Sequence, residues 1–299
     1  VIRAYFYYSM ANIWGNVPLV LASQTLGDRP QQSTQEQVFA QVIKDCQEAA
    51  VDLPESYTSQ DVGRLHKYSA IALVGKTYMQ QRKWAEAAAA LKQIVDKTPT
   101  RFELMPDFKD NFTTAAENNK ESLFEIQYYE ENRLGFPNYD VAGGSESSER
   151  AQFFGLRNTD GFKGGGWCDG QPTKWLYNQF LKEKDKSGKV DYRLDYTLFY
   201  GGSSLKPYGK TYAEFTQSTG GKDFKPDLDR FWIKYTNYFK ANDSYFSGIN
   251  NRVIRLADIY LLYAEALNET GNTAAALPLL NRVRKRVGLA DKTGLSQAE

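Results

Sequence analysis

Two copies of one helix-pair pattern, far apart along the chain, constrain its fold more than any other feature of the sequence. In both copies, small and large apolar residues recur at the offsets of a tetratricopeptide unit, a pair of antiparallel helices joined by a short turn. These residues are Ile71, Val74, Gly75, Tyr78, Ala87, Leu91 and Ile94 in the first copy, and Tyr260, Tyr263, Ala264, Leu267, Ala276, Leu280 and Val283 in the second. One such pair cannot bury its apolar face alone, so we predict that the two copies stack despite the long segment between them.

The turns of the two copies are predicted at residues 81–83 and 270–272, the second of which contains a glycine that readily adopts a positive φ. An earlier helix pair is predicted over residues 2–13 and 35–53, with Pro54 ending its second helix. Two unrelated amphipathic hairpins are the alternative, but six offsets agree between the copies. The predicted fold class is mainly α: tetratricopeptide-like helical hairpins stacked in a superhelix, with a loop-rich insertion containing short strands and helices.

The composition of the chain changes between its ends and its middle. Residues 101–250 hold 30 of the 42 aromatic residues and 16 of the 23 glycines. A loop-rich segment of this length inside a compact domain is usually functional or disordered, and the aromatic density argues against disorder. We predict one domain in three parts: residues 1–100 are the first part of a helical scaffold, residues 101–250 are an aromatic- and glycine-rich ligand-binding insertion, and residues 251–299 are the last part of the scaffold.

Local patterns predict a few elements inside the insertion. Apolar and polar residues alternate over residues 122–128, which predicts a strand, and residues 231–235 are a second strand candidate. Three consecutive glycines at 164–166 predict a turn. A helix is predicted from Thr173 through Phe180. Most rings of the insertion are expected to pack in its interior, the usual place for aromatic residues.

Charge and residue inventory exclude several classes of function. Lys+Arg number 37 and Asp+Glu 36, so the net charge is +1, which argues against a nucleic-acid binder with a broad basic face. One histidine (His66, expected at the surface or as a helix cap) and two cysteines nearly exclude a histidine metal site, a histidine-dependent triad and a disulfide framework. The glycines at 164–166 lack the Lys and Ser/Thr of a phosphate loop. We therefore predict a protein that is not an enzyme, with no catalytic residues, metal ligands or cofactor.

Four motifs follow one another along the chain. They are residues 2–5 leading to a Gly-x-x-Pro turn at 15–18, Gly63-Arg64, the strand candidate at 121–126, and the helix at 255–266 continuing to 281–288. In this order they resemble the SusD/RagB family of outer-membrane nutrient-binding (starch- and glycan-binding) lipoproteins, and the resemblance extends over essentially the whole chain. It implies stacked tetratricopeptide-like pairs with a loop-rich, ligand-binding excursion, in agreement with the repeat.

The resemblance also implies a function and partners. It predicts non-catalytic, cell-surface binding of an oligosaccharide or polysaccharide, and its delivery to a SusC-like TonB-dependent outer-membrane transporter. The expected location is the outer membrane of a Gram-negative, Bacteroidetes-type bacterium. Attachment there is expected through an N-terminal lipid lying outside this sequence, because we interpret the chain as an internal fragment of a longer protein.

Candidate binding residues follow from the resemblance and from the chemistry of sugars. Tyr139 resembles the tyrosine that follows the strand in the family, and Trp167 is similar to the family's tryptophan. The C–H groups on a sugar face stack on an aromatic ring, and the hydroxyl groups around it need polar partners. Asn138 beside Tyr139, and Asp169 and Gln171 beside Trp167, are the hydrogen-bonding candidates. The alternative is that the rings pack the insertion onto the scaffold, as we expect for Trp14 and Trp84 in the helical parts.

A second function remains open. Tetratricopeptide grooves often bind peptides, so the chain is alternatively a peptide- or protein-binding adaptor that captures nutrient peptides. The two functions differ in where exposed rings lie: on the loops of the insertion for a sugar, and along the helical groove for a peptide. Stacking detects the face of a sugar ring and not its epimer, so the sequence does not identify the glycan.

Overall fold

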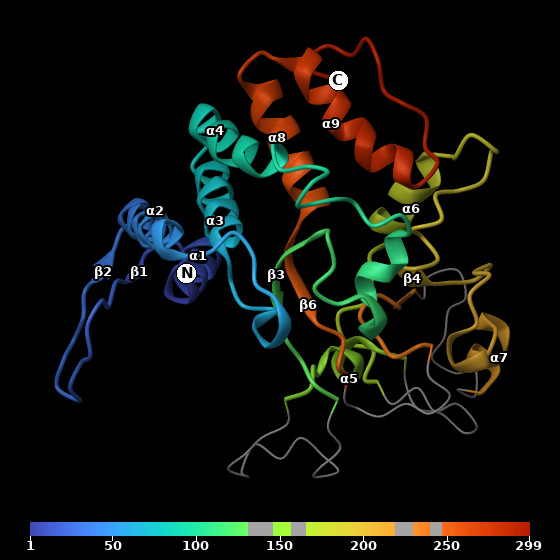
Figure 1. Ribbon diagram of the computed structural model, residues 1–299. Helices are drawn as coiled ribbons and strands as arrows, with labels where there is room; N and C mark the ends of the chain where they lie inside the picture. The colour runs from blue at the N-terminus through green and yellow to red at the C-terminus, as the bar shows by residue number, and fades with distance from the viewer. Residues whose placement is uncertain (131–145, 157–165, 219–229, 240–246) are drawn as a thin grey trace.

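The computed structural model describes residues 1–130, 146–156, 166–218, 230–239 and 247–299 of the chain (Figure 1). Six helices form the scaffold: α1 (Ile2–Trp14), α2 (Gln35–Asp52), α3 (Lys67–Gln80), α4 (Trp84–Val95), α8 (Leu256–Glu269) and α9 (Thr273–Arg286). Each packs on the next in this order, and α4 contacts α8 directly although the insertion separates them in sequence. The predictions of a mainly helical fold and of stacked helical hairpins are confirmed.

Helix boundaries follow from local chemistry. Thr34 caps α2 with a capping box, in which its hydroxyl accepts from the backbone N–H of Gln37 and the Gln37 side chain accepts from the backbone N–H of Thr34. Gly75 of α3 faces Leu91 of α4 so closely that an added Cβ would lie 2.5 Å from a Leu91 methyl group. The glycine is therefore what lets α3 and α4 approach. Gly271, between α8 and α9, has a φ of 80°, as expected for the turn of the second copy.

The apolar core of the scaffold has two parts. Side chains of α3, α4, α8 and α9 form the larger part around the buried residues Leu91, Ile94 and Ile259, and strand residues Leu123 and Ile254 contribute to it. Side chains of α1, α2 and α3 form the other part. Trp84 packs against the larger part, as predicted. Trp14 does not: it is 66% exposed at the end of α1, so the prediction that it packs is wrong.

Two paired strands close the base of the insertion. β3 (Ser122–Ile126) is antiparallel to β6 (Asn251–Arg255), and β6 runs directly into α8. The strand predicted at residues 122–128 is thus present and ends two residues early. The second candidate is shorter than predicted: β5 (Phe231–Trp232) pairs with β4 (Leu198–Phe199), and the positive φ of Tyr235, 64°, is incompatible with an extended run to that residue.

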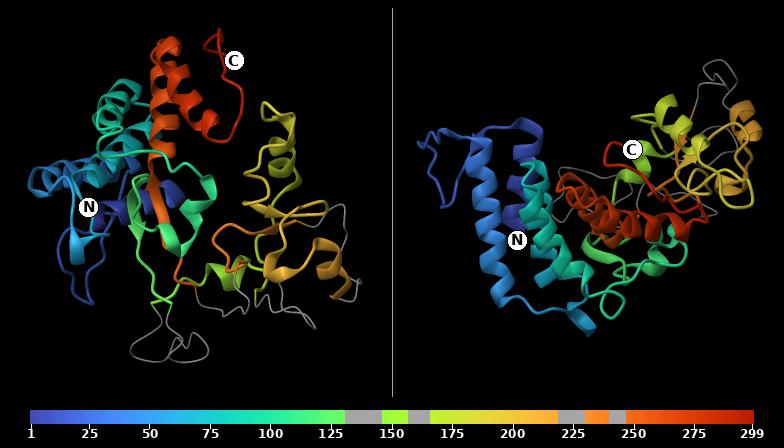
Figure 2. Two further views of the ribbon diagram at one scale, coloured as in Figure 1. Left: turned by 45° about the vertical axis from the view of Figure 1, so that its right-hand side comes forward. Right: turned by 90° about the horizontal axis from the view of Figure 1, so that it is seen from above.

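The insertion contains short elements around a core of its own. Besides β3, β4 and β5 they are α5 (Arg150–Phe154), α6 (Lys174–Lys182), α7 (Tyr212–Ser218) and the 3₁₀ helices Phe108–Phe112, Thr114–Ala116 and Pro207–Gly209. The helix predicted from Thr173 to Phe180 is α6, with the Thr173 hydroxyl as its N-cap. Leu156, Phe199, Phe215 and Phe231 are buried together beneath these elements. The two views of Figure 2 show this part beside the scaffold, on the side of α9 rather than of α1.

Outside these two parts, the strands β1 (Val17–Pro18) and β2 (Gln32–Ser33) form a hairpin between α1 and α2, and residues Ser59–Asp61 form a 3₁₀ helix before α3. Ion pairs hold the insertion to the scaffold. Glu121, just before β3, accepts hydrogen bonds of 2.6 Å from Arg255 of β6 and from Arg286 of α9. Glu183, after α6, binds Arg284 of α9 at 2.9 Å.

Candidate functional site

The loop that carries Trp167 is fixed by backbone contacts with α5. The N–H of Trp167 donates to the carbonyl of Gln152 at 2.7 Å, and the N–H of Asp169 donates to the carbonyl of Phe153 at 2.7 Å. Gly166 lies so close to Gly155 that an added Cβ would be 2.1 Å from the Gly155 carbonyl oxygen. Two glycines are therefore required where the loop crosses the end of α5.

The Trp167 ring stands on this loop with one side supported and much of its surface open. It meets the ring of Phe153 edge-on, with centroids 5.1 Å apart and planes at 88°. Such an edge-to-face contact is a favourable arrangement for two aromatic rings. The residue is nevertheless 44% exposed. A large ring held in one orientation and open to solvent is suited to stacking on a flat apolar face of a ligand.

The structure brings three of the five predicted site residues together. Asp169 and Gln171 follow Trp167 on the same loop, both exposed, and neither side chain makes a hydrogen bond or ion pair within the described ranges. Trp232 of β5 anchors the loop, because its indole N–H donates to the Gly170 carbonyl at 2.6 Å. The other two predicted residues, Asn138 and Tyr139, lie outside the described residues.

Two exposed rings near this loop were not among the predicted site residues. Phe154, the last residue of α5, lies beside Gly170, 3.4 Å from the position of an added Cβ. Trp175 is 69% exposed in the first turn of α6. The signal that the sequence offers for Trp175 is the pair of polar residues just before it, Thr173 and Lys174, although the apolar Leu176 follows it directly. The helical pattern of residues 173–180 predicts a helix that contains Trp175 and no binding role for its ring.

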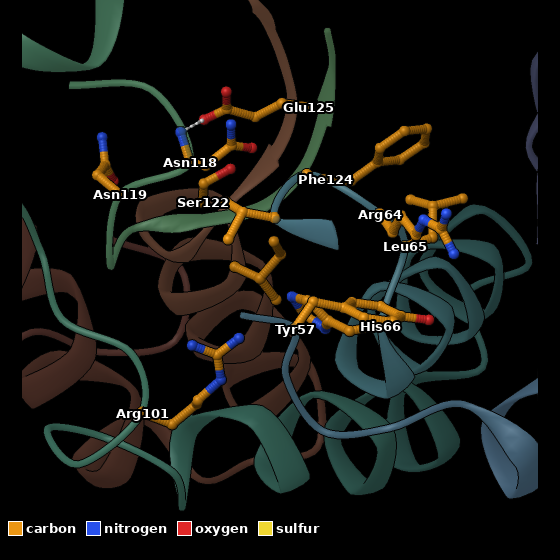
Figure 3. A pocket seen from close by; sticks show the side chains of 13 residues that line it. Tyr57, Arg64, Leu65, His66, Arg101, Asn118, Asn119, Ser122, Phe124 and Glu125 are labelled. Atoms are coloured by element: carbon orange, nitrogen blue, oxygen red, sulfur yellow. Dashed lines mark hydrogen bonds between the residues drawn. The ribbon is translucent and has the colours of Figure 1, made fainter. Parts of the chain in front are cut away.

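Cavities occur away from the Trp167 loop, among the helices of the scaffold and beside the β3–β6 strand pair. The cavity in Figure 3, about 140 Å³, lies between the segment before α3 and strand β3. His66 lines it and caps α3 by accepting from the Ser69 N–H, so the expected capping role is confirmed, although the residue is buried rather than at the surface. Burial, assisted by Arg101, lowers the pKa of His66 to about 4 and keeps it neutral.

The polar groups around this cavity form hydrogen bonds and ion pairs with one another. The backbone N–H of Asn118 donates to Glu125, as the dashed line in Figure 3 shows, and the Asn250 amide donates to the other oxygen of the same carboxylate at 3.0 Å. Arg252 lies 3.3 Å from Glu125 in a buried ion pair. The lining therefore stabilises the β3–β6 junction and offers few free groups to a ligand.

Asp191 and Asp195 are two neighbouring carboxylates of the kind that glycoside hydrolysis requires, and both are bound by nearby side chains. Asp191 accepts from Arg193, and Asp195 accepts from the hydroxyl of Tyr200 at 2.9 Å. Within the described ranges, no three His, Cys, Asp or Glu side chains gather as a metal site would require. No helix of that part has the length and apolar character needed to cross a membrane.

Comparison with known proteins gives consistent matches along the chain. Residues 120–297 match the model of the SusD family, and residues 1–79 match a model described as starch-binding associating with outer membrane. SusD-like protein P25 of Formosa agariphila is 26% identical over 310 residues, covering 95% of this chain and 54% of that protein. The chain spans about half the length of the curated relatives it matches.

Solved structures share the fold. A SusD superfamily protein from Bacteroides vulgatus superimposes with a TM-score of 0.81 at 26% identity, covering 99% of this chain and 60% of that one. A laminarin-binding SusD-like protein gives a TM-score of 0.76 at 26% identity, covering 97% and 63%. Since the family model matches more than half of the residues and the helical stack is shared with these structures, the chain belongs to the SusD family.

Proposed function

We propose that this chain is part of a non-catalytic glycan-binding protein of the cell surface, and that Trp167 is a stacking platform for a sugar. The observation that carries the proposal is the exposed Trp167 ring on a loop fixed by backbone hydrogen bonds. The similarity to a laminarin-binding SusD-like protein supports it. A ring that is already in position loses little conformational entropy when a sugar stacks on it, so more of the contact energy becomes affinity.

The neighbours of Trp167 supply the remaining chemistry. The side chains of Asp169 and Gln171 have no partner among the described residues and can bind the hydroxyls at the rim of a stacked sugar. Trp175 is a further exposed ring on the next element. Tyr139 and Asn138 are proposed as a second platform and its hydrogen-bonding partner on the basis of the family resemblance.

Delivery to a SusC-like TonB-dependent transporter and attachment to the outer membrane through a lipid outside this sequence are part of the same proposal. The match of residues 1–79 to a model described as associating with the outer membrane supports the location. The transporter follows from the family resemblance.

A peptide- or protein-binding adaptor is the second candidate, and one observation favours it. The outer face of α1 exposes Ile2, Phe6, Ile13 and Trp14, which is more apolar surface than a solvated helix usually presents. Helix α1 lies on the side of the scaffold away from α6 and α7 (Figure 2). Trp167 lies on a loop of the insertion instead, with the exposed Phe154 and Trp175 on the short helices before and after it. An exposed ring on such a loop is expected for sugar binding, and for that reason glycan binding is preferred.

Affinity electrophoresis of the full-length protein in gels containing laminarin, xyloglucan or other polysaccharides tests the proposal. We expect Trp167→Ala to weaken retention by about 30-fold in Kd, which corresponds to about 2 kcal/mol for a central aromatic contact. Trp14→Ala removes a scaffold tryptophan that is still more exposed, 66% against 44%, and is the matched control, expected to leave retention unchanged. Retention of Trp167→Ala at the wild-type level overturns the site. Loss of retention in Trp14→Ala, together with binding of peptides by the wild type, supports the adaptor.

A further inference from the structure

A group of cationic side chains meets where the insertion joins the scaffold, and we call it the cation cluster. Its members come from five separate parts of the chain, and four of them lie over the rings of Phe108, Phe112 and Tyr235. They are Arg150 at the start of α5, Arg193, Lys234 after β5, Arg255 at the end of β6 and Arg286 of α9.

Lys234 lies at the centre of the cation cluster without an anionic partner. Its ammonium nitrogen is 4.1 Å from the ring centroid of Phe112 and 5.4 Å from that of Phe108. It makes no hydrogen bond or ion pair with any acceptor in the ranges that the structure describes. An ammonium group has three N–H donors, and the faces of two rings satisfy none of them fully.

Three of the four arginines of the cluster lie over the same group of rings. The guanidinium carbon of Arg255 is 5.8 Å from the Phe112 centroid, and that of Arg286 is 5.7 Å from the Phe108 centroid. Arg150 lies 4.8 Å from the ring of Tyr235, which in turn meets Phe112 edge-on at 5.2 Å. The positive charges therefore converge on one small region instead of spreading over a surface.

Two carboxylates neutralise only part of this charge. Glu121 pairs with Arg255 and Arg286, and Asp191 pairs with Arg193. Arg150, like Lys234, has no carboxylate partner among the described residues. Burial, followed by the charges of Arg255, Arg193, Arg150 and Arg286, lowers the pKa of Lys234 to about 7. A fold that holds unpaired cations together in this way is unfavourable unless an anion completes the group.

We propose that the cation cluster binds an oxyanion group, a carboxylate or a sulfate, with Lys234 and Arg150 as its main hydrogen-bond donors. Both side chains form short, charge-assisted hydrogen bonds to such groups, and the planar guanidinium can bind two oxygens at once. The partly free guanidinium groups of Arg193 and Arg255 add long-range attraction.

The position of the cluster links it to the glycan site, and this step rests on the proposed function. Arg150 and Phe153, which supports Trp167, belong to the same short helix α5. Trp232, two residues before Lys234, holds the Trp167 loop through the Gly170 carbonyl. Because the ring platform and the cation cluster are built on the same elements, the oxyanion belongs to an acidic sugar of the bound glycan, a uronic acid or a sulfated sugar.

Isothermal titration of the full-length protein tests the proposal with four probes: an oligogalacturonate, a sulfated carrageenan oligosaccharide, a neutral laminari-oligosaccharide of similar length, and sodium sulfate. We expect Lys234→Gln and Arg150→Gln each to weaken binding of at least one acidic oligosaccharide by tenfold or more and to leave any neutral binding within twofold. Lys83→Gln, which removes an exposed lysine from the scaffold, is the matched control and should change nothing. Equal loss for acidic and neutral probes, or no loss for either, overturns the proposal.

The pH dependence supplies a second readout. The other cations that face Lys234 are arginines, which stay charged, while Glu121 has a lowered pKa and Tyr235 a raised one, so Lys234 is the group that titrates near pH 7. An anion favours the protonated amine, so wild-type affinity for the acidic probe should fall as the pH rises from 6 to 8. The same series should be flat in Lys234→Gln, and an unchanged slope in that variant contradicts the assignment.

The titration with sodium sulfate distinguishes an oxyanion carried by a sugar from a free anion. It also allows the oxyanion site to be tested independently of the proposed glycan binding. If the acidic oligosaccharide binds tenfold more tightly than sulfate, the oxyanion belongs to a sugar. If the two bind with equal affinity, the site is assigned to a free anion and the acidic sugar is rejected. If no glycan is retained at all, the proposed function fails. The oxyanion site is then still tested by whether sodium sulfate raises the Tm of the wild type more than that of Lys234→Gln at matched ionic strength.

Discussion

Burial and the charges of four arginines disfavour the protonated form of the Lys234 amine. Its pKa falls from the ordinary 10.5 to about 7, so between these two values the unfolded chain binds more protons than the folded chain. The stability of the fold therefore rises with pH across this range, and the cost of the charge is fully present below pH 7.

We predict that Lys234→Met stabilises the unliganded protein at pH 6 by about 1 kcal/mol or more, because a similar apolar volume replaces an uncompensated charge. The advantage should shrink at pH 9, where the wild-type amine is largely neutral. Urea unfolding in chloride buffer at the two pH values measures this. A methionine variant that is less stable than the wild type at pH 6 would mean that the contacts with Phe112 and Phe108 outweigh the buried charge.

The surroundings of some single residues can be predicted from the sequence, and those of others cannot. Three glycines before Trp167 and an aspartate two residues after it give the ring little local apolar cover, and the ring is indeed open. Trp14 was misplaced because a helical pattern does not say whether the last turn of a helix meets a neighbour. The cation cluster was missed since Arg150, Lys234 and Arg255 are far apart along the chain, and no local pattern brings them together.

Among the elements, the loop after α5 depends on glycine most strictly. In Gly166→Ala the new Cβ would meet the carbonyl oxygen of Gly155, a backbone atom that cannot move alone. We expect a loss of about 2 kcal/mol in stability, comparable to overpacking elsewhere, and a larger relative loss in glycan affinity because Trp167 is displaced.

Thermal unfolding and affinity electrophoresis of the same samples measure both effects. Gly27→Ala is the control, because its Cβ would meet nothing within 4 Å, and its stability should stay within about 0.5 kcal/mol of the wild type. A Gly166→Ala variant that binds glycan normally would show that the loop relaxes without moving its ring.

The helices could be predicted well because their signals are local. Apolar spacing, caps and turn residues specified all six scaffold helices to within a few residues. Strands depend on a partner that is distant in sequence, and so β5 is shorter than its apolar run suggested: β4 offers only two residues to pair with, and the backbone turns at Tyr235. The limits of the insertion at residues 101–250 stay a prediction.

Across the whole molecule, Glu121 is the point where three parts of the chain are held together. Its carboxylate is fully buried and binds Arg255, Arg286, the Asn111 amide and the backbone N–H of Met105. Burial opposes the charge of Glu121, but the charges of Arg286 and Arg255 outweigh burial and lower the pKa of the carboxyl group. The stability that the carboxylate contributes is therefore fully present above the ordinary glutamate pKa and is lost as the pH falls through the lowered pKa.

Glu121→Gln leaves two buried guanidinium groups without their anion, and we predict a loss of about 3–5 kcal/mol at pH 7. The difference from the wild type should narrow as the pH falls below the ordinary glutamate pKa, because the unfolded chain then takes up the proton before the native carboxylate does. Glu103→Gln, which breaks an exposed ion pair with Lys120, should cost less than about 1 kcal/mol. Hydrogen exchange in β3, β6 and α9 localises the effect, and protection that is unchanged in all three would contradict this role.

The paired strands β3 and β6 have one more consequence. The chain leaves the helical stack and returns to it through neighbouring strands, so the two ends of the intervening segment are about 5 Å apart, the spacing of paired strands. Replacing a segment whose ends already meet costs little chain entropy, even when the replacement differs greatly in length. The β3–β6 pair therefore allows evolution to exchange the recognition loops between the two strands while the helices keep their sequence. Chimaeras joined at these strands should have the ligand specificity of the protein that donates the loops.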